Sequence, residues 1–588
     1  MNIEVFQLNL LFMKFIYHLM CNKNKKINYL KKKLIQFCKH YFCAMKYLLY
    51  CIIALLAIGC REKPQADVIE FNGTIYTIDS AFSTAEAMVI KNGKIIFTGS
   101  SADAFKNFET KDSVNLNGKF VYPGFIDAHC HFYGFGLELN KVNLMNTTSW
   151  NDVLQKTKQF VATHPNAEWI QGRGWDQNDW TDKTYPTKKE LDILFPDKPV
   201  FLRRIDGHAG VANSKALALA NITSKTIVSG GEIVLEQNEP TGLLIDNAMT
   251  LVEKIIPLPN TSQNENALLD AQQKCFEVGL TSIADAGLML NVIQQMDTLQ
   301  QKNKLKMRVY AMIADDSISK NYFFKHGKLK TEKLNVCSVK YYADGALGSR
   351  GACLKHGYAD QKKHFGFLLK EQNYFKQQAE LCNKYGFQMN VHCIGDSSNA
   401  ILLQLMANEL KTKNDKRWRI EHAQIMDTTD LHYFNDYTIL PSIQPAFATS
   451  DMYWAEQRTG KNNFAGSYLL KSFLKYSVVI PCGSDFPIEN YNPMVSLYAA
   501  VSRQDQKYFP VNGFKKEEAL TIKDAIKGFT IWAAYGCFED KEKGSLEKGK
   551  YADFIIFEND LLKTETKNIF NQKPSETWVN GIKVFQKK

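Results

Sequence analysis

The chain has 588 residues, of which 45% are hydrophobic and 23% charged, and its formal net charge is +11. These proportions are ordinary for a globular protein and exclude collagen, coiled coils and intrinsic disorder. A chain this long can bury a large core without a disulfide framework, and its 13 cysteines are too irregularly spaced for one. No run of 18 apolar residues follows the N-terminal region, which excludes a polytopic membrane protein.

Most of the positive charge lies at the N-terminus. Residues 1–59 contain nine lysines and one glutamate, so the rest of the chain carries only +3. That low charge, together with the lack of a nucleic-acid motif, predicts no nucleic-acid partner. From Met45 a positive start and a short apolar run lead to Gly59 and Cys60, which is typical of a secretory signal with a lipoprotein cleavage site.

This segment resembles bacterial lipoprotein signals, although Ala57 stands where leucine is usual. The resemblance implies that Cys60 carries a lipid anchor and that the protein is exported to the periplasmic or cell-surface side of a membrane. An uncleaved anchor helix is the alternative. We expect residues 1–44 to be a leader extension or a misassigned start, residues 45–59 the signal peptide, and residues 60–66 a tether.

Both ends of the remaining chain are rich in β-forming residues. Asn72-Gly73 and Asn92-Gly93 each stand between β-rich runs, and Asn-Gly is the strongest short hairpin signal. The last fifty residues repeat this pattern. We therefore predict a small β-sandwich domain composed of residues 67–121 and 541–588.

The middle of the chain, residues 122–540, alternates helical stretches with short apolar runs that end in polar residues. This pattern predicts an α/β fold, a (β/α)8 TIM-like barrel, with its active site at the C-terminal ends of the strands. A doubly wound open sheet is the alternative, but no glycine-rich nucleotide loop follows a first strand. The 208 residues between His131 and Lys340 exceed two strand–helix units, which predicts an insertion at about residues 140–270.

Four histidines and an aspartate end predicted strands. His129 and His131 are two residues apart, so on a strand both imidazoles point the same way and can bind one metal ion. His392 and His422 end two later apolar runs. Asp485 follows another apolar run and supplies a carboxylate that can bind a metal and accept a proton from a bound water.

Five segments together resemble the metal-dependent amidohydrolase superfamily, in particular the branch that includes the N-substituted formamide deformylases (amidohydrolase family 3). They are VYPGFIDAHCH at 121–131, KYYADGALGSR at 340–350, VHCIGD at 391–396, RIEHAQ at 419–424 and GSDFP at 483–487. The matches extend from about residue 67 to residue 585. They are specific for the superfamily and the branch, and much less so for the substrate.

The resemblance implies a site for two divalent metal ions, expected to be Zn²⁺. One ion would be bound by His129 and His131, with Asp485 beside it, and the other by His392 and His422. Lys340 matches a bridging lysine that is carboxylated by CO₂, a reaction that needs the neutral amine and therefore a depressed pKa. Without this modification we expect a single tightly bound metal.

The implied function is hydrolysis of a C–N bond in a small-molecule amide, N-formyl compound or cyclic amide. The mechanism would be attack by a metal-activated hydroxide, with Asp485 as the general base. A deaminase or lactonase on the same metal site, or a non-catalytic binding lipoprotein on a hydrolase barrel, are the alternatives.

Three further residues are candidates for binding the substrate. Trp175 and His208 lie in insertion motifs similar to those of the same branch, although Trp175 could equally be a packing residue. Arg350, in the loop after Lys340, would contact the substrate or close the barrel.

Overall fold

The computed structural model describes residues 63–177, 180–204, 209–228, 231–348 and 350–588, with short stretches between residues 11 and 46. The chain divides into two units, Met1–Gln65 and Ala66–Lys588. In the first unit the described residues up to 46 are helical. The signal segment after Lys46 and its Cys60 lie outside the described residues. Within the described part of the chain, no helix has the length and apolar character needed to cross a membrane.

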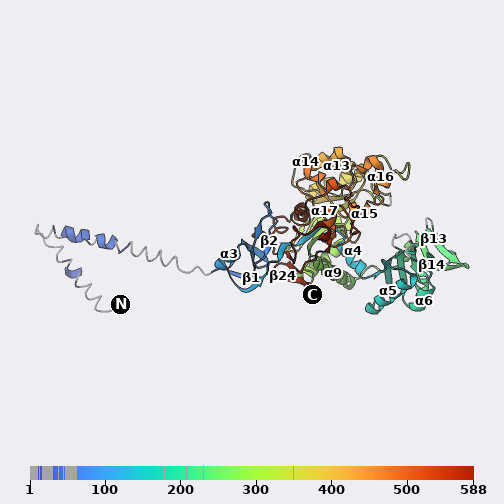
Figure 1. The fold of residues 1–588 in the computed structure, drawn as a ribbon, viewed down its shortest axis with the longest axis horizontal. Coiled ribbons are helices and arrows are strands. Elements are labelled where there is room, and N and C mark those ends of the chain that lie inside the picture. Colours follow the sequence, from blue (N-terminus) through green and yellow to red (C-terminus); the bar gives the residue numbers. More distant parts are fainter. Residues whose placement is uncertain are drawn as a thin grey trace. The chain divides into compact units, whose positions relative to one another are not determined.

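The second unit is built around a curved sheet of parallel strands (Figure 1). The order of the strands is β8 (Phe125–Cys130), β15 (Leu280–Leu288), β16 (Arg308–Ile313), β18 (Leu334–Tyr342), β19 (Gln388–Cys393), β20 (Arg419–His422) and β21 (Leu440–Ser442). Every residue of β8 and β16 is buried, as expected for parallel strands covered on both faces. The main covering helices are α4 (Phe132–Leu139), α9 (Thr261–Glu277), α10 (Leu290–Gln301), α11 (Ser317–His326), α12 (Gln372–Tyr385) and α13 (Asp396–Leu410).

Residues 480–485 take the place of an eighth strand. The Ile443 amide, just after β21, donates to the Pro481 carbonyl at 3.0 Å, and the Ala128 amide of β8 donates to the Cys482 carbonyl at 3.0 Å. The Asp485 amide then donates to the His129 carbonyl at 2.7 Å. This segment thus joins the first strand to the last, which confirms the predicted TIM-like barrel and brings Asp485 beside His129.

Two smaller sheets combine the ends of the unit. One contains β5 (Lys94–Gly99), β4 (Ala87–Lys91), β1 (Gln65–Phe71) and β6 (Glu109–Asn115). The other contains β24 (Ile582–Gln586), β23 (Glu576–Val579), β22 (Phe554–Phe557), β7 (Phe120–Pro123), β2 (Thr74–Tyr76) and β3 (Thr84–Ala85). Val68 and Ile90 from the first sheet share a buried cluster with Phe554 and Trp578 from the second. The predicted β-sandwich built from both ends is therefore confirmed.

One of the two Asn-Gly hairpin predictions is wrong. Asn92-Gly93 does connect the antiparallel pair β4 and β5. Asn72-Gly73 instead carries the chain from one sheet to the other, because β1 pairs with β4 whereas β2 pairs with β7 and β3. Asn72 has a positive φ of 59°, and a Cβ on Gly73 would lie 2.5 Å from Leu116. The dipeptide thus connects strands of two different sheets, packed closely against Leu116, and does not form a hairpin turn.

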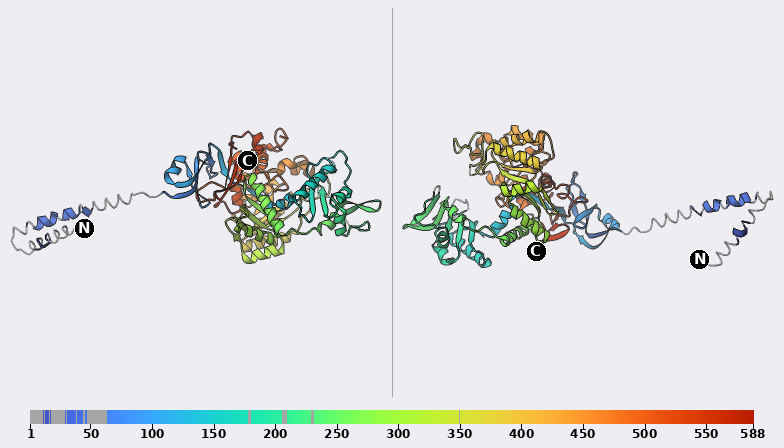
Figure 2. Two further views of the ribbon diagram at one scale, coloured as in Figure 1. Left: turned by 90° about the horizontal axis from the view of Figure 1, so that it is seen from below. Right: turned by 180° about the vertical axis from the view of Figure 1, so that it is seen from behind.

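The predicted insertion forms a lobe with its own sheet, which lies beside α4 in the views of Figures 1 and 2. Its strand order is β13 (Gly231–Glu236), β14 (Glu239–Asp246), β12 (Ala209–Ala212), β11 (Val200–Arg204), β10 (Ile170–Trp175) and β9 (Val142–Asn143). The helices of the lobe are α5 (Trp150–Thr163), α6 (Lys189–Leu194), α7 (Ser214–Leu219) and α8 (Met249–Glu253). Trp175 is fully buried in the core of this lobe, and its indole donates to the Leu202 carbonyl at 2.9 Å.

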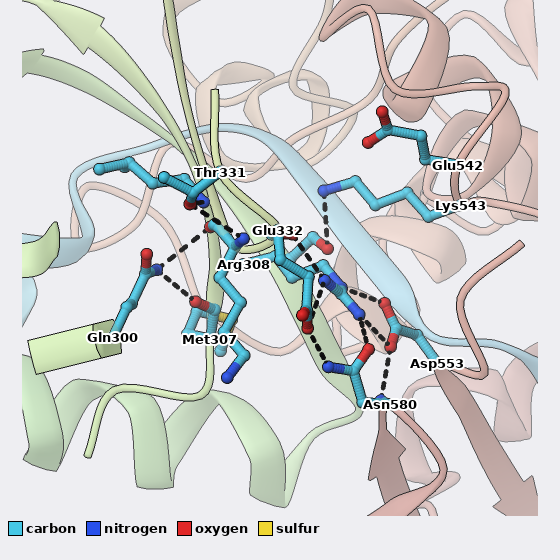
Figure 3. Close-up of polar contacts among 12 residues, drawn as sticks. Gln300, Met307, Arg308, Thr331, Glu332, Glu542, Lys543, Asp553 and Asn580 are labelled. Atoms are coloured by element: carbon cyan, nitrogen blue, oxygen red, sulfur yellow. Dashed lines mark hydrogen bonds and ion pairs between the residues drawn. The ribbon is translucent and has the colours of Figure 1, made fainter. Parts of the chain in front are cut away.

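A buried ion pair ties the barrel to the β-sandwich at the N-terminal end of β16 (Figure 3). Arg308 Nε lies 2.5 Å from Asp553 Oδ2, and Arg308 Nη2 donates to Asp553 Oδ1 at 3.0 Å. The guanidinium also contacts Asn580 and stacks on the Tyr551 ring at 3.8 Å. This ion pair lies at the N-terminal end of the barrel strands, opposite the predicted site, so it stabilises the fold without contacting that site.

Candidate metal centre

Three predicted ligands meet at the C-terminal end of β8. His131 Nε2 and His129 Nε2 lie 3.3 and 3.5 Å from Asp485 Oδ1, and the candidate ligand atoms of the three residues are all within 4.8 Å of one another. Two imidazoles and a carboxylate suit a divalent ion such as Zn²⁺. Asp485 Oδ1 is buried and has no hydrogen-bond partner among the described residues, which is costly unless a cation binds there. The residues therefore fit a metal.

The other two histidines line the same end of the barrel. The ring of His422 lies 4.8 Å from that of His129 and 4.5 Å from that of His392, measured between centroids. His392 Nε2 is buried without a hydrogen-bond partner in the described part of the chain. Burial and the nearby Lys340 lower the pKa of His392 to about 3, so its imidazole is neutral, the form that binds metals.

The side chain of Lys340, on β18, reaches the same group of histidines. Its Nζ lies 3.0 Å from His129 Nε2, and the residue is fully buried. Burial lowers the pKa of Lys340 to about 8, against the opposing influence of the Glu421 and Asp485 carboxylates. This lower pKa raises the fraction of neutral amine near physiological pH, the form that a carboxylation reaction needs.

Backbone strain occurs at the ligands themselves. Asp485 and His422 have positive φ values of 63° and 74°, a region that non-glycine residues rarely adopt. The Asp127 carboxylate holds the closing segment in place by accepting from the Ser484 amide at 3.1 Å and from the Ser484 hydroxyl at 2.6 Å. Asp127 also accepts from the His129 amide at 3.0 Å. These contacts hold the segment that carries the strained Asp485 against β8.

Two residues outside the predicted ligand set contact the Nδ1 atoms of His129 and His422 and so orient the rings. Glu421 Oε2 lies 2.5 Å from His129 Nδ1, and Gln444 Oε1 lies 2.6 Å from His422 Nδ1. Sequence reasoning missed both residues. For Glu421 a signal was available, because Arg419 and Glu421 place two opposite charges on one face of a buried strand that ends in His422. For Gln444 we find no such signal.

The sequence profile of the amidohydrolase family matches residues 112–585. This chain belongs to the amidohydrolase family. The chain is 30% identical over 525 residues to the Bacillus subtilis (strain 168) protein YtcJ, whose name places it among amidohydrolases, with 88% of this chain and 98% of YtcJ covered. It is 25% identical over 554 residues to the N-substituted formamide deformylase of Arthrobacter pascens, with 89% of this chain and 98% of that protein covered.

A solved structure supports the same assignment. The uncharacterized metal-dependent hydrolase of Pyrococcus horikoshii OT3 superimposes with a TM-score of 0.73 at 28% identity, covering 85% of this chain and 99% of that one. The shared fold covers the barrel and the additional sheets. As a member of this family, the chain is a metal-dependent hydrolase, with His129, His131 and Asp485 as the residues that can hold the metal.

Of the remaining candidate residues of this amidohydrolase, Arg350 and Trp175, which the structure describes, make their contacts away from the metal centre. Arg350 forms a two-pronged contact with Asp360, at 3.1 and 2.8 Å. Trp175 packs inside the insertion lobe, and His208 lies outside the described residues. Tyr342, which sequence reasoning passed over, lies closer: its ring is 5.7 Å from that of His392 and 38% of the residue is exposed.

Proposed function

We propose that this amidohydrolase cleaves the C–N bond of a small amide, with N-substituted formamides as the first substrate class to test. The buried cluster of His129, His131 and Asp485 at the mouth of the barrel is the observation that carries this proposal. The likeness to a formamide deformylase along nearly its whole length supports the substrate class. A divalent metal bound here would supply a Lewis acid and lower the pKa of a bound water toward neutrality.

The protein residues divide the remaining work. Asp485 Oδ1 faces both imidazoles, so it can accept the proton of the attacking water and return it to the leaving nitrogen. Lys340, once carboxylated, would add an anionic oxygen ligand between the two histidine pairs. The neutral imidazoles of His392 and His422 would then complete a second metal site, and without the carbamate we expect one ion.

A substrate panel tests this function. We expect the purified protein to release formate from N-benzylformamide and to act less on N-benzylacetamide, whose acyl group is larger. The His129→Ala variant should lose this activity by on the order of 10³-fold, because one of the three clustered ligands is gone.

The same panel should contain γ-butyrolactone and adenosine, because a lactonase or a deaminase could act through the same metal site. Hydrolysis of either compound at a rate well above that of both amides would contradict the proposed bond class. No turnover of any compound by zinc-loaded protein would favour the hypothesis of a non-catalytic binding lipoprotein.

A further inference from the structure

A fully buried ion pair lies directly behind the metal centre. Arg419 Nε lies 2.7 Å from Glu421 Oε1, and Arg419 Nη2 lies 3.0 Å from Glu421 Oε2. The same Nη2 donates to the Ala128 carbonyl at 2.6 Å and to the Ser442 hydroxyl at 2.8 Å. Both side chains have no exposed surface. The pair thus links β20 to its neighbour β21 and, across the barrel, to β8.

A buried ion pair seldom improves stability over well-packed apolar residues, because both charges lose their hydration. The contacts of this pair point to another use. Glu421 Oε2, at 2.5 Å from His129 Nδ1, joins the guanidinium to an imidazole whose other nitrogen faces Asp485. A histidine that binds a metal usually donates its second ring N–H to a carboxylate, which fixes the tautomer and the ring orientation.

We propose that Glu421 is a positioning residue that keeps the proton of His129 on Nδ1, with Arg419 holding Glu421 in place. Nε2, which faces Asp485 and Lys340, then stays unprotonated and can bind metal. The inference rests on the proposed metal-dependent function but concerns the selection of one ring nitrogen. Arg419 contacts the Glu421 carboxylate through Nε and Nη2, and the contacts of Nη2 with Ala128 and Ser442 hold the guanidinium in place. Glu421 would therefore be needed for tight metal binding although it is not itself a ligand.

The chain offers a matched control at the other end of the barrel. Glu539 is also a buried glutamate in an ion pair, with Lys543 at 2.6 Å and Lys330 at 2.6 Å. Within the described part of the chain, its ion-pair partners are lysines and not a histidine, and Lys543 in turn donates to Ser282. Glu539→Gln therefore removes the same charge from a buried pair without touching the metal centre.

The experiment compares Glu421→Gln with Glu539→Gln in the full-length protein. Zn²⁺ affinity is measured by competition with a chelator, and the His129 tautomer by ¹⁵N NMR of protein labelled at the histidine ring nitrogens. We expect Glu421→Gln to weaken Zn²⁺ binding by about 10- to 100-fold. It should also shift proton occupancy from Nδ1 toward Nε2 in the metal-free protein. Glu539→Gln should leave both readouts unchanged.

The outcomes separate this inference from the proposed function. If the wild type binds no Zn²⁺, the proposed function fails. If the wild type binds Zn²⁺ and Glu421→Gln binds it within twofold, or if Glu539→Gln is weakened equally, the positioning role is wrong. Should Glu421→Gln not fold, Arg419→Lys keeps the positive charge but loses the two-pronged contact. An unchanged Zn²⁺ affinity and an unchanged His129 tautomer in Arg419→Lys would then overturn the proposal.

Discussion

Replacing Asp485 with asparagine is expected to lower kcat by about 10³- to 10⁴-fold, while the protein stays folded. Asparagine has nearly the same shape and keeps one oxygen that can face His129 and His131, but it cannot accept the proton of the attacking water. The measurement is formate release from N-benzylformamide at saturating substrate, with the metal content determined on the same samples. The loss should therefore appear in kcat at an unchanged or slightly lower metal content.

The control for this variant is Asp436→Asn, which makes the same chemical change in a surface pair with His432. We expect no change in kcat there, because both side chains of this pair are exposed to solvent on helix α14 (His432–Tyr437). If Asp485→Asn keeps its metal and retains more than a tenth of the wild-type kcat, Asp485 is not the proton acceptor. Another group would then have to carry that proton.

Arg308→Met should be the most damaging of the substitutions outside the site, lowering the free energy of unfolding by about 3–5 kcal/mol. The reason is that Asp553, only 5% exposed, would be left as an uncompensated buried carboxylate. The contact with Asn580 and the stacking on Tyr551 would also be lost. Urea unfolding followed by circular dichroism measures the change in midpoint and slope.

Two further variants test whether the unpaired buried charge causes the loss of stability in Arg308→Met. Lys567→Met breaks the exposed pair with Glu565 and should change stability by less than about 1 kcal/mol. Adding Asp553→Leu to Arg308→Met should restore part of the loss, because the unpaired charge is removed. A double variant as unstable as the single one would show that lost packing, and not the buried charge, dominates.

The barrel and its ligand positions could be predicted from sequence because both depend on local patterns. The apolar run before His129, the two-residue spacing to His131 and the run before Asp485 each predict a strand end. Parallel strands in a barrel bring such ends to one face. The part of residues 480–485 in closing the barrel is harder to predict from sequence. These residues connect β21 and β8 through a few backbone hydrogen bonds, and only Cys482 among them forms a β-bridge, with Ile443.

The remaining parts depend on contacts between residues that are distant in sequence. Glu421 and His129 are 292 residues apart, and nothing local shows that their side chains meet across the barrel. The course of Asn72-Gly73 is set by Leu116, which packs under the passage from a different part of the chain. The sequence makes Trp175 a candidate for binding the substrate, yet its side chain is buried in the core of the insertion lobe. Composition and periodicity carry no information on such pairings.

The metal content of the purified wild-type protein, measured by elemental mass spectrometry beside His129→Ala, tests the central claim most directly. We expect at least one zinc-like ion per wild-type chain, and two if Lys340 is carboxylated, because the second histidine pair then gains a bridging ligand. His129→Ala should hold clearly less, since the cluster at Asp485 loses one of its three ligands. Fewer than one ion per wild-type chain after reconstitution with zinc, or equal contents in the two proteins, would contradict the proposed metal centre.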